Sequence, residues 1–198
     1  YDATLEQFLA TGKVWFTKDE KQVQKLREIV FVDGHLNKDV VGRTAREIGA
    51  MAGIDVPASA RIILLPAKGA GTADILAKEK LCPVVAILPY KTFDEAVKNA
   101  KANLLVEGAG HSAALHSNDE KHIRDAGVEL PISRLVVNQP SSLTAGGSLT
   151  NGFAPTTTLG CGSWGGNSIS ENLDYKHLMN VSRIGKVITG KKVPTDEE

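Results

Sequence analysis

Residues 155–173, PTTTLGCGSWGGNSISENL, combine the residue types that most often form a ligand site. Four glycines flank Cys161, and they let the backbone adopt positive φ angles and approach a ligand closely, at an entropic cost that an ordinary loop avoids. The alternative interpretation is a glycine-rich surface loop without a ligand. Two residues elsewhere in the chain, Glu79 and His111, favour a site.

The run GCGSWG, residues 160–165, has the GxGxxG spacing of a dinucleotide-binding fingerprint. That fingerprint requires a strand before it, a long helix after it and a second strand that carries an acidic residue. Residues 167–173 are polar and poor helix formers, and no such strand follows them. We therefore do not interpret these glycines as a Rossmann phosphate loop.

Cys161 and His111 are candidates for a nucleophile and its base, because a nearby imidazole stabilises a thiolate and glycines expose the cysteine. His111 directly follows Gly108 and Gly110 in the run GAGH. Glycines there indicate a close backbone approach, and an imidazole can act as general acid or base near neutral pH. The alternatives are a structural cysteine that lines a pocket and a histidine bonded to a local carbonyl. Spacing alone does not separate these interpretations.

The remaining candidates for a functional site are one carboxylate, Glu79, and one group of residues with the spacing of metal ligands. Glu79 comes shortly before a buried strand, where a carboxylate can accept hydrogen bonds from both hydroxyls of a ribose; the alternative is a surface charge at a helix end. His116, Asp119 and His122 are spaced as metal ligands can be, but they straddle a strand end and a helix cap. We expect a solvated helix start there, and we predict no metal site.

Hydrophobic periodicity and capping residues predict the elements that position these side chains. Helices are predicted up to Gly12, after a capping box at 17–20, and over 37–52, 72–80, 92–104 and 117–126. In the helix over 37–52 the predicted buried side is Val40, Val41, Ile48 and Met51, with Gly53 as its end. Strands are predicted over 61–65, 84–88, 112–116 and 135–138.

The strands are apolar runs rather than alternating patterns, which indicates burial on both faces. The predicted fold class is therefore α/β, three layers with a mostly parallel sheet between helices. Residues 139–173 form a Gly/Ser-rich segment too long for a routine connection, and a final strand is predicted over 178–188. This divides the chain into an α/β domain (1–138), the Gly/Ser-rich active-site segment (139–173) and a C-terminal strand and tail (174–198).

Composition excludes several classes of function. Lys plus Arg and Asp plus Glu number 23 each in 198 residues, so no net field attracts nucleic acid or an anionic membrane. The longest apolar run is much too short to cross a bilayer. The two cysteines, Cys82 and Cys161, form no CxxC pair, so we expect neither a disulfide framework nor a zinc site, and a reducing cytoplasm fits best.

The runs EKLCPV from Glu79 and LPYKTFDEAV from Leu88 resemble the Glu-x-x-Gly-Pro segment of the aldehyde dehydrogenase superfamily and the helix after it. Gly110-His111 and LGCGSWGGNSISENLDYKHLMN, from Leu159, narrow the resemblance to the CoA-acylating branch, including the aldehyde dehydrogenase half of bifunctional aldehyde-alcohol dehydrogenases. It covers nearly the whole chain. Cys82 departs from it, because most of the superfamily has glycine there.

The resemblance implies the α/β catalytic domain of that family and its reaction. A cysteine thiolate attacks an aldehyde, hydride passes to NAD or NADP, and coenzyme A takes the acyl group from the enzyme thioester. It implies that Glu79 holds the nicotinamide ribose and that His111 is the base for the CoA thiol. Leu159, Gly160, Cys161 and Gly162 then line the nicotinamide and aldehyde pocket, with Cys161 as a wall residue.

In this family the nucleophilic cysteine lies just upstream of the helix with which the chain begins, and the Rossmann domain lies further upstream. The chain opens on Tyr1, within an amphipathic helix, so we expect the C-terminal catalytic portion of the enzyme, inactive alone and part of a homo-oligomer. Acetaldehyde is the expected substrate, with succinic semialdehyde and sulfoacetaldehyde as alternatives. Two other hypotheses are a self-sufficient Cys161/His111 enzyme and a non-catalytic module that binds a nucleotide or a protein partner.

Overall fold

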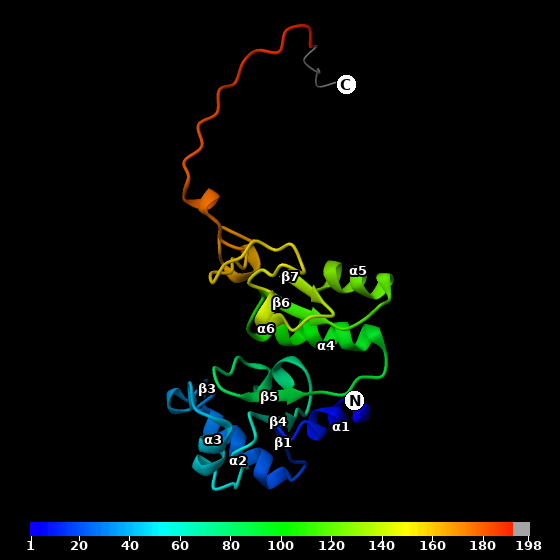
Figure 1. Cartoon of the computed structure of the whole chain (residues 1–198), viewed down its shortest axis with the longest axis vertical. Helices are drawn as coiled ribbons and strands as arrows, with labels where there is room; N and C mark the ends of the chain where they lie inside the picture. The colour runs from blue at the N-terminus through cyan, green and yellow to red at the C-terminus, as the bar shows by residue number, and fades with distance from the viewer. Residues whose placement is uncertain (192–198) are drawn as a thin grey trace.

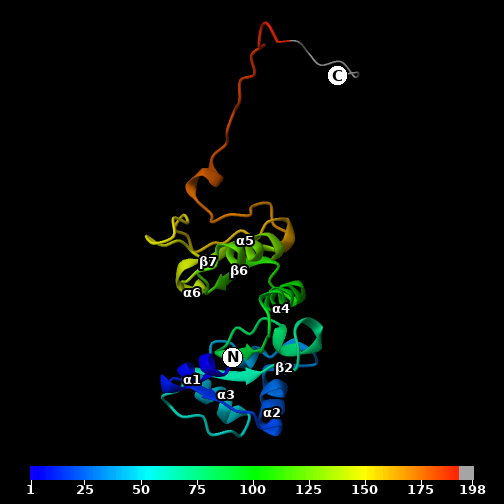
Figure 2. The same ribbon diagram turned by 90° about the vertical axis from the view of Figure 1, so that its right-hand side faces the viewer.

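The computed structural model describes residues 1–191. Figure 1 shows two α/β bodies, one above the other, and a last segment that leads away from both. Helix α4 (Phe93–Val106) lies between the sheets of the two bodies, as the view at right angles in Figure 2 also shows. The chain is therefore elongated.

The first body is built on a three-stranded sheet in the order β1-β4-β5, with all strands parallel. Its strands are β1 (Val14–Phe16), β4 (Ile62–Pro66) and β5 (Val84–Ile87). Around the sheet lie α1 (Asp2–Ala10), α2 (Glu20–Val30), α3 (Ala45–Met51) and a short hairpin of β2 (Phe31–Val32) with β3 (His35–Leu36). Three 3-10 turns, η1 (Lys38–Val40), η2 (Gly71–Ala73) and η3 (Ile75–Ala77), complete it.

The core of this body forms where α2 and α3 pack against the central strand β4. Leu26 and Ile48 on the helices, and Ile63 and Leu65 on the strand, have no exposed surface. One buried ion pair adds to this core: the Arg27 guanidinium donates from Nε and Nη2 to the two carboxylate oxygens of Asp74, at 3.2 and 2.6 Å. Helix α2 is thereby fixed to the connection between β4 and β5.

The second body is built on two parallel strands, β6 (Gly110–Leu115) and β7 (Ile132–Val137). Helices α4 and α5 (Glu120–Glu129) pack on one face of this pair. The contacts on that face include Ala113, Leu115 and Leu135 from the strands, with Leu104 and Ala126 from the helices. The other face carries Ser112, Arg134 and Val136, because side chains alternate along a strand.

Residues 139–173 cover this other face. The segment begins with the one-turn helix α6 (Ser141–Thr144), continues to the glycine-rich segment with η4 (Ser163–Gly165), and is followed by η5 (Tyr175–Leu178). Arg134 of β7 donates to the carbonyl of Gly160 at 2.9 Å. The second body therefore has three layers: helices, strands, and an irregular layer that contains the glycine-rich segment. Parallel strand pairing and the α/β class agree with the sequence prediction.

Two predicted helices are wrong in extent. Over 37–52 the chain forms η1 and then α3, because Gly42 has φ 72° and Thr44 begins a new helix with a capping box to Glu47. Val41 and Met51 are consequently exposed, whereas Val40 and Ile48 are buried as predicted.

Over 72–80 the chain forms η2 and η3 instead of one helix. The Asp74 side chain accepts from the amides of Lys68 and Leu76 and pairs with Arg27, which fixes a turn in place of a helix. The cap of α2 also differs, since Asp19 accepts from the amides of Lys21 and Gln22 in place of Thr17.

Two strand predictions also need correction. Among the described residues, the strands predicted to form one sheet fall into two separate sheets, β1-β4-β5 and β6-β7, and the short strand β1 was not predicted. The final strand over 178–188 is absent: Leu178 ends η5, and residues 179–189 have no regular structure and are exposed. A strand needs a neighbour to bond with, and this segment runs clear of both bodies (Figure 1). The predicted tail after residue 191 lies outside the described residues.

Among residues 1–191, no helix has the length and hydropathy needed to cross a bilayer. In the same part of the chain, no group of three or more His, Cys, Asp or Glu side chains could hold a metal ion.

Candidate functional site

The glycine-rich segment folds back on itself as an irregular loop. Leu159 and Asn172 form an antiparallel bridge, and the amides of Gly160 and Gly162 donate to the carbonyls of Glu171 and Ile169 at 3.0 and 2.9 Å. The Asn167 carboxamide closes the tip by accepting from the amide of Cys161 at 3.0 Å. The segment is therefore hydrogen-bonded throughout, unlike a loose surface loop.

Gly110 makes the close backbone approach that the sequence indicates. Its φ is 82°, and a Cβ on it would lie 1.9 Å from the carbonyl oxygen of Cys161. Only a residue without a side chain allows β6 to begin this close to the glycine-rich segment. The Cys161 backbone is thus the neighbour that leaves no room for a side chain at position 110. This contact also places His111, the next residue, beside the glycine-rich segment.

A cavity of about 400 Å³ opens where β6 meets the loop. His111 and Leu159, two of the predicted site residues, both line it. The rest of its wall is small or hydroxyl-bearing, and consists of Ser112, Ser141, Ser142, Ala145, Gly146, Thr156 and Thr157. We call this cavity the His111 pocket. No lysine or arginine of the described residues lines it.

Glu79 lies elsewhere. It follows η3 in the first body, is exposed, and does not line the His111 pocket. Its amide donates to the Glu107 carboxylate at 2.7 Å, but its own carboxylate has no hydrogen bond within the described residues. Those two oxygens are therefore available to accept from a ligand. The next residue, Lys80, is half-buried, and burial lowers the pKa of its ammonium group.

Cys161 does not form a dyad with His111. Its Sγ lies 3.9 Å from the Leu159 carbonyl oxygen, and no hydrogen bond joins the two side chains within residues 1–191. The residue is half-buried, and Gly165 packs on its Cβ. A thiol without a base in contact lacks the group that would activate it as a nucleophile.

The rejected motifs have structural explanations. Within 160–178 only the short turns η4 and η5 follow the GxGxxG spacing, so no helix N-terminus is available for a pyrophosphate. Asp119 caps α5 by accepting from the amides of Lys121 and His122, and these bonds, that of His122 first, lower the pKa of its carboxyl group. His122 stacks on Phe93 with ring centroids 3.9 Å apart.

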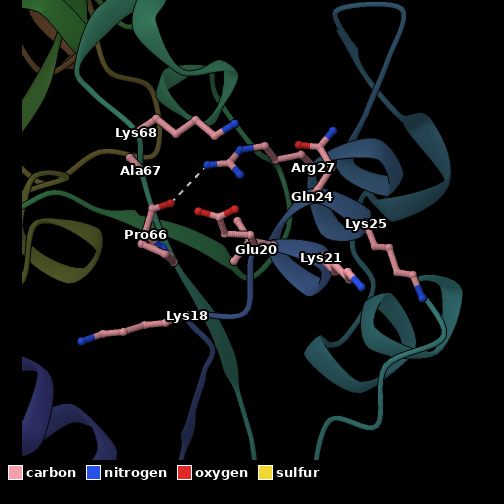
Figure 3. A pocket seen from close by; sticks show the side chains of 10 residues that line it. Lys18, Glu20, Lys21, Gln24, Lys25, Arg27, Pro66, Ala67 and Lys68 are labelled. Carbon is pink, nitrogen blue, oxygen red and sulfur yellow. Dashed lines mark hydrogen bonds between the residues drawn. The ribbon is translucent and has the colours of Figure 1, made fainter.

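A larger cavity, of about 810 Å³, lies in the first body at the carboxyl ends of β1 and β4. Figure 3 shows Lys18, Lys68 and Glu20 around it, with Arg27 donating to the Pro66 carbonyl at 3.2 Å. None of the predicted site residues lines this cavity.

The sequence prediction missed Arg134 and Asn172, which lie behind the His111 pocket. Both are buried, at 3% and 7% exposure, and Nη1 of Arg134 donates to Oδ1 of Asn172 at 3.4 Å. The Asn172 carboxamide in turn donates to the carbonyls of Ala145 and Ala154. The signal in the sequence was a single arginine inside the apolar run ISRLVV.

Comparisons with known proteins find relatives that act on aldehydes, by their names. The chain is 54% identical over 198 residues to the succinate-semialdehyde dehydrogenase (acetylating) of Clostridium kluyveri, covering 100% of this chain and 43% of that protein. It is 34% identical over 190 residues to the bifunctional aldehyde-alcohol dehydrogenase of Escherichia coli K12, covering 94% of this chain and 21% of that protein. No protein-family model matches the chain.

A solved structure agrees with these relatives. The acetylating aldehyde dehydrogenase of Geobacillus thermoglucosidasius superposes with a TM-score of 0.86 at 31% identity, covering 98% of this chain and 42% of that one. The chain thus spans about two fifths of its most similar single-function relatives. By sequence and by fold, along its whole length, the relatives of this chain are acylating aldehyde dehydrogenases.

Proposed function

We propose that this chain is the C-terminal catalytic portion of an NAD(P)-dependent, CoA-acylating aldehyde dehydrogenase. The reaction converts an aldehyde, coenzyme A and NAD(P)⁺ to an acyl-CoA, NAD(P)H and a proton. The observation that carries the proposal is that His111 and Leu159 line one pocket. The close contact of Gly110 with the Cys161 backbone holds the glycine-rich segment beside this pocket. Relatives whose names state acetylating activity support the reaction class.

In this proposal His111 accepts the proton of the CoA thiol, since an imidazole exposed at a pocket edge is a suitable base near neutral pH. The nucleophilic cysteine lies outside these 198 residues, and Cys161 is a wall residue. Gly160 and Gly162 belong to the wall with Leu159, and their role is to let the loop pack closely.

Glu79 holds the nicotinamide ribose. Its unpaired, exposed carboxylate fits two hydroxyl donors, and charge-assisted hydrogen bonds of this kind fix a ring for reaction. NAD(P), when bound, supplies the acceptor for the aldehyde's hydride. A solved propionaldehyde dehydrogenase at 25% identity was obtained with CoA bound and a cysteine acylated, which supports CoA as the co-substrate.

We propose acetaldehyde as the substrate. No lysine or arginine among residues 1–191 lines the His111 pocket, so this part of the chain offers no cation there to an anionic aldehyde. Succinic semialdehyde is the second candidate, because the 54% identical relative is named for it. We also propose a homo-oligomer in the cytoplasm, where free cysteines such as Cys82 and Cys161 stay reduced.

The proposal is tested with a chimera in which this chain replaces the matching segment of the Clostridium kluyveri relative. We expect the chimera to form NAD(P)H from acetaldehyde only when CoA is present, and the 198-residue chain alone to form none. His111→Ala should lower kcat/KM for CoA about 100-fold or more. The matched control is His116→Ala, an exposed histidine just beyond β6, which should stay within about twofold of the parent.

Other outcomes would replace the proposal. Turnover by the chain alone would make Cys161 the nucleophile. Saturable nucleotide binding by a folded but inactive chimera would instead favour a non-catalytic module. A kcat/KM for succinic semialdehyde at least tenfold above that for acetaldehyde would change the substrate but not the reaction.

A further inference from the structure

Arg134 is an unusual buried residue, because its charge has no carboxylate partner. It is 3% exposed, and within residues 1–191 no ion pair includes it. Burying a guanidinium is costly unless its donors are all used. Among residues 1–191 the other buried arginine is Arg27, whose charge is compensated by Asp74. If this position served only the stability of the core, an apolar side chain would serve it at lower cost. The presence of an arginine there therefore needs another explanation.

The Arg134 guanidinium bonds only to neutral acceptors, which lie on β6 and on the glycine-rich segment. On β6, its Nε donates to Ser112 Oγ at 3.0 Å and its Nη2 to the carbonyl of His111 at 3.3 Å. A further, longer bond of Nη2 reaches the carbonyl of Gly110 at 3.4 Å. On the glycine-rich segment, Nη2 donates to Gly160 at 2.9 Å.

The remaining donor extends this connection to a third part of the wall. Nη1 contacts Asn172, whose carboxamide donates to the carbonyls of Ala145 and Ala154 at 3.1 and 2.8 Å. Ala145 lines the His111 pocket. The planar, rigid guanidinium of Arg134 therefore joins β6, the loop after α6 and the glycine-rich segment. The ammonium group of a lysine cannot donate hydrogen bonds in all of these directions.

We propose that Arg134 is a positioning residue that sets the separation of His111 from the Leu159–Gly162 wall. Its side chain does not line the His111 pocket, and it acts through the backbone carbonyls of His111 and Gly160. The kinetic part of this inference rests on the proposed function. The structural part does not.

The structural part is tested in the 198-residue chain by hydrogen exchange of the Gly160 and Gly162 amides, which bond across the loop. Arg134→Met keeps the volume but removes every donor, and we expect both amides to exchange about tenfold faster or more. Arg134→Lys should recover part of the protection. Arg27→Met is the control, since it breaks a buried ion pair far from the loop; the variants are compared at denaturant concentrations that give equal stability.

The kinetic part is tested in the chimera. Arg134→Met should lower kcat with acetaldehyde about tenfold or more, leave KM for NAD(P) within about twofold, and be partly rescued by Arg134→Lys. An inactive parent chimera would refute the proposed function, while the exchange rates would still decide the structural part. The inference is overturned if Arg134→Met and Arg27→Met loosen the loop equally, or if an active chimera keeps its kcat in Arg134→Met.

Discussion

The two buried arginines show that one residue type serves two purposes in this chain. Arg27 is matched by the Asp74 carboxylate, which also accepts from two backbone amides. Burial by itself would raise the pKa of Asp74, but the hydrogen bonds from Arg27, Leu76 and Lys68 outweigh it and lower the pKa below the ordinary value. Arg134 has only neutral acceptors. The first arginine contributes to stability, and the second to the shape of the site.

The ion pair gives a prediction about pH. A carboxylate whose pKa is lower in the folded state than its unfolded value of about 3.9 stabilises the fold fully above about pH 4, and the contribution is lost as pH falls through the folded pKa. Asp74→Asn leaves Arg27 buried without a counter-charge, so we expect about 3–5 kcal/mol less stability at pH 7.

The measurement is urea unfolding of both proteins from pH 7 to pH 3. The gap between them should be constant down to about pH 4 and then narrow. A gap that stays the same down to pH 3 would mean that the charge of Asp74 is not what stabilises the fold.

At the scale of elements, two helix glycines are expected to respond oppositely to the same substitution. In α5, a Cβ on Gly127 would lie 3.8 Å from Leu135, an ordinary contact, so Gly127→Ala should stabilise the chain by about 0.5–1 kcal/mol. In α3, a Cβ on Gly49 would lie 2.4 Å from Val56, so Gly49→Ala should destabilise it by about 1–3 kcal/mol. Thermal unfolding of the pair checks this, and a shift of the same sign in both would contradict it.

Elements with strong local signals were predictable from the sequence. Helix α4 begins at the predicted cap Thr92, and α5 begins within the predicted cap region at Asp119. The failures have tertiary causes. The ion pair of Asp74 with Arg27, 47 residues away, replaced a predicted helix by turns, and three-residue β1 is too short to show a pattern. Such contacts cannot be read from local periodicity.

The site was predictable only in part, for a similar reason. Glycines before His111 correctly indicated a close backbone approach, because positive φ and the absence of Cβ are local requirements. Which segment makes the approach was not predictable from the residues alone, since Cys161 lies 50 residues away. Arg134 was missed because three of its partners are backbone carbonyls, which every sequence contains, and its two side-chain partners, Ser112 and Asn172, are distant in sequence.

At the scale of the whole molecule, the chain exposes more surface than a compact protein of its size. Its accessible surface is 13490 Å², against about 9000 Å² expected for a compact monomer of 21.1 kDa. Residues 179–191 contribute to this excess, as Figure 1 indicates. Ile184 and Val187 in that segment are 89% and 90% exposed.

These exposed residues give a prediction about stability. Ile184→Ser and Val187→Ser should each change the free energy of unfolding by less than about 0.5 kcal/mol, because neither side chain is buried. Leu26→Ala, at a fully buried position, should cost about 2–5 kcal/mol. Denaturant titration at several protein concentrations is the measurement. A loss from the serine variants that depends on concentration would show that this segment packs against another copy of the chain.

The contact between Gly110 and the Cys161 carbonyl also bears on how the site can evolve. Any side chain at position 110 would strike main-chain atoms, which no compensating substitution of a neighbour can remove. Ser141, Ser142, Thr156 and Thr157, in contrast, line the pocket with side chains that single mutations can exchange. Descendants of this sequence can therefore acquire new ligand preferences at the hydroxyl positions while inheriting an unchanged backbone, so the framework of the pocket and its ligand preference can diverge independently.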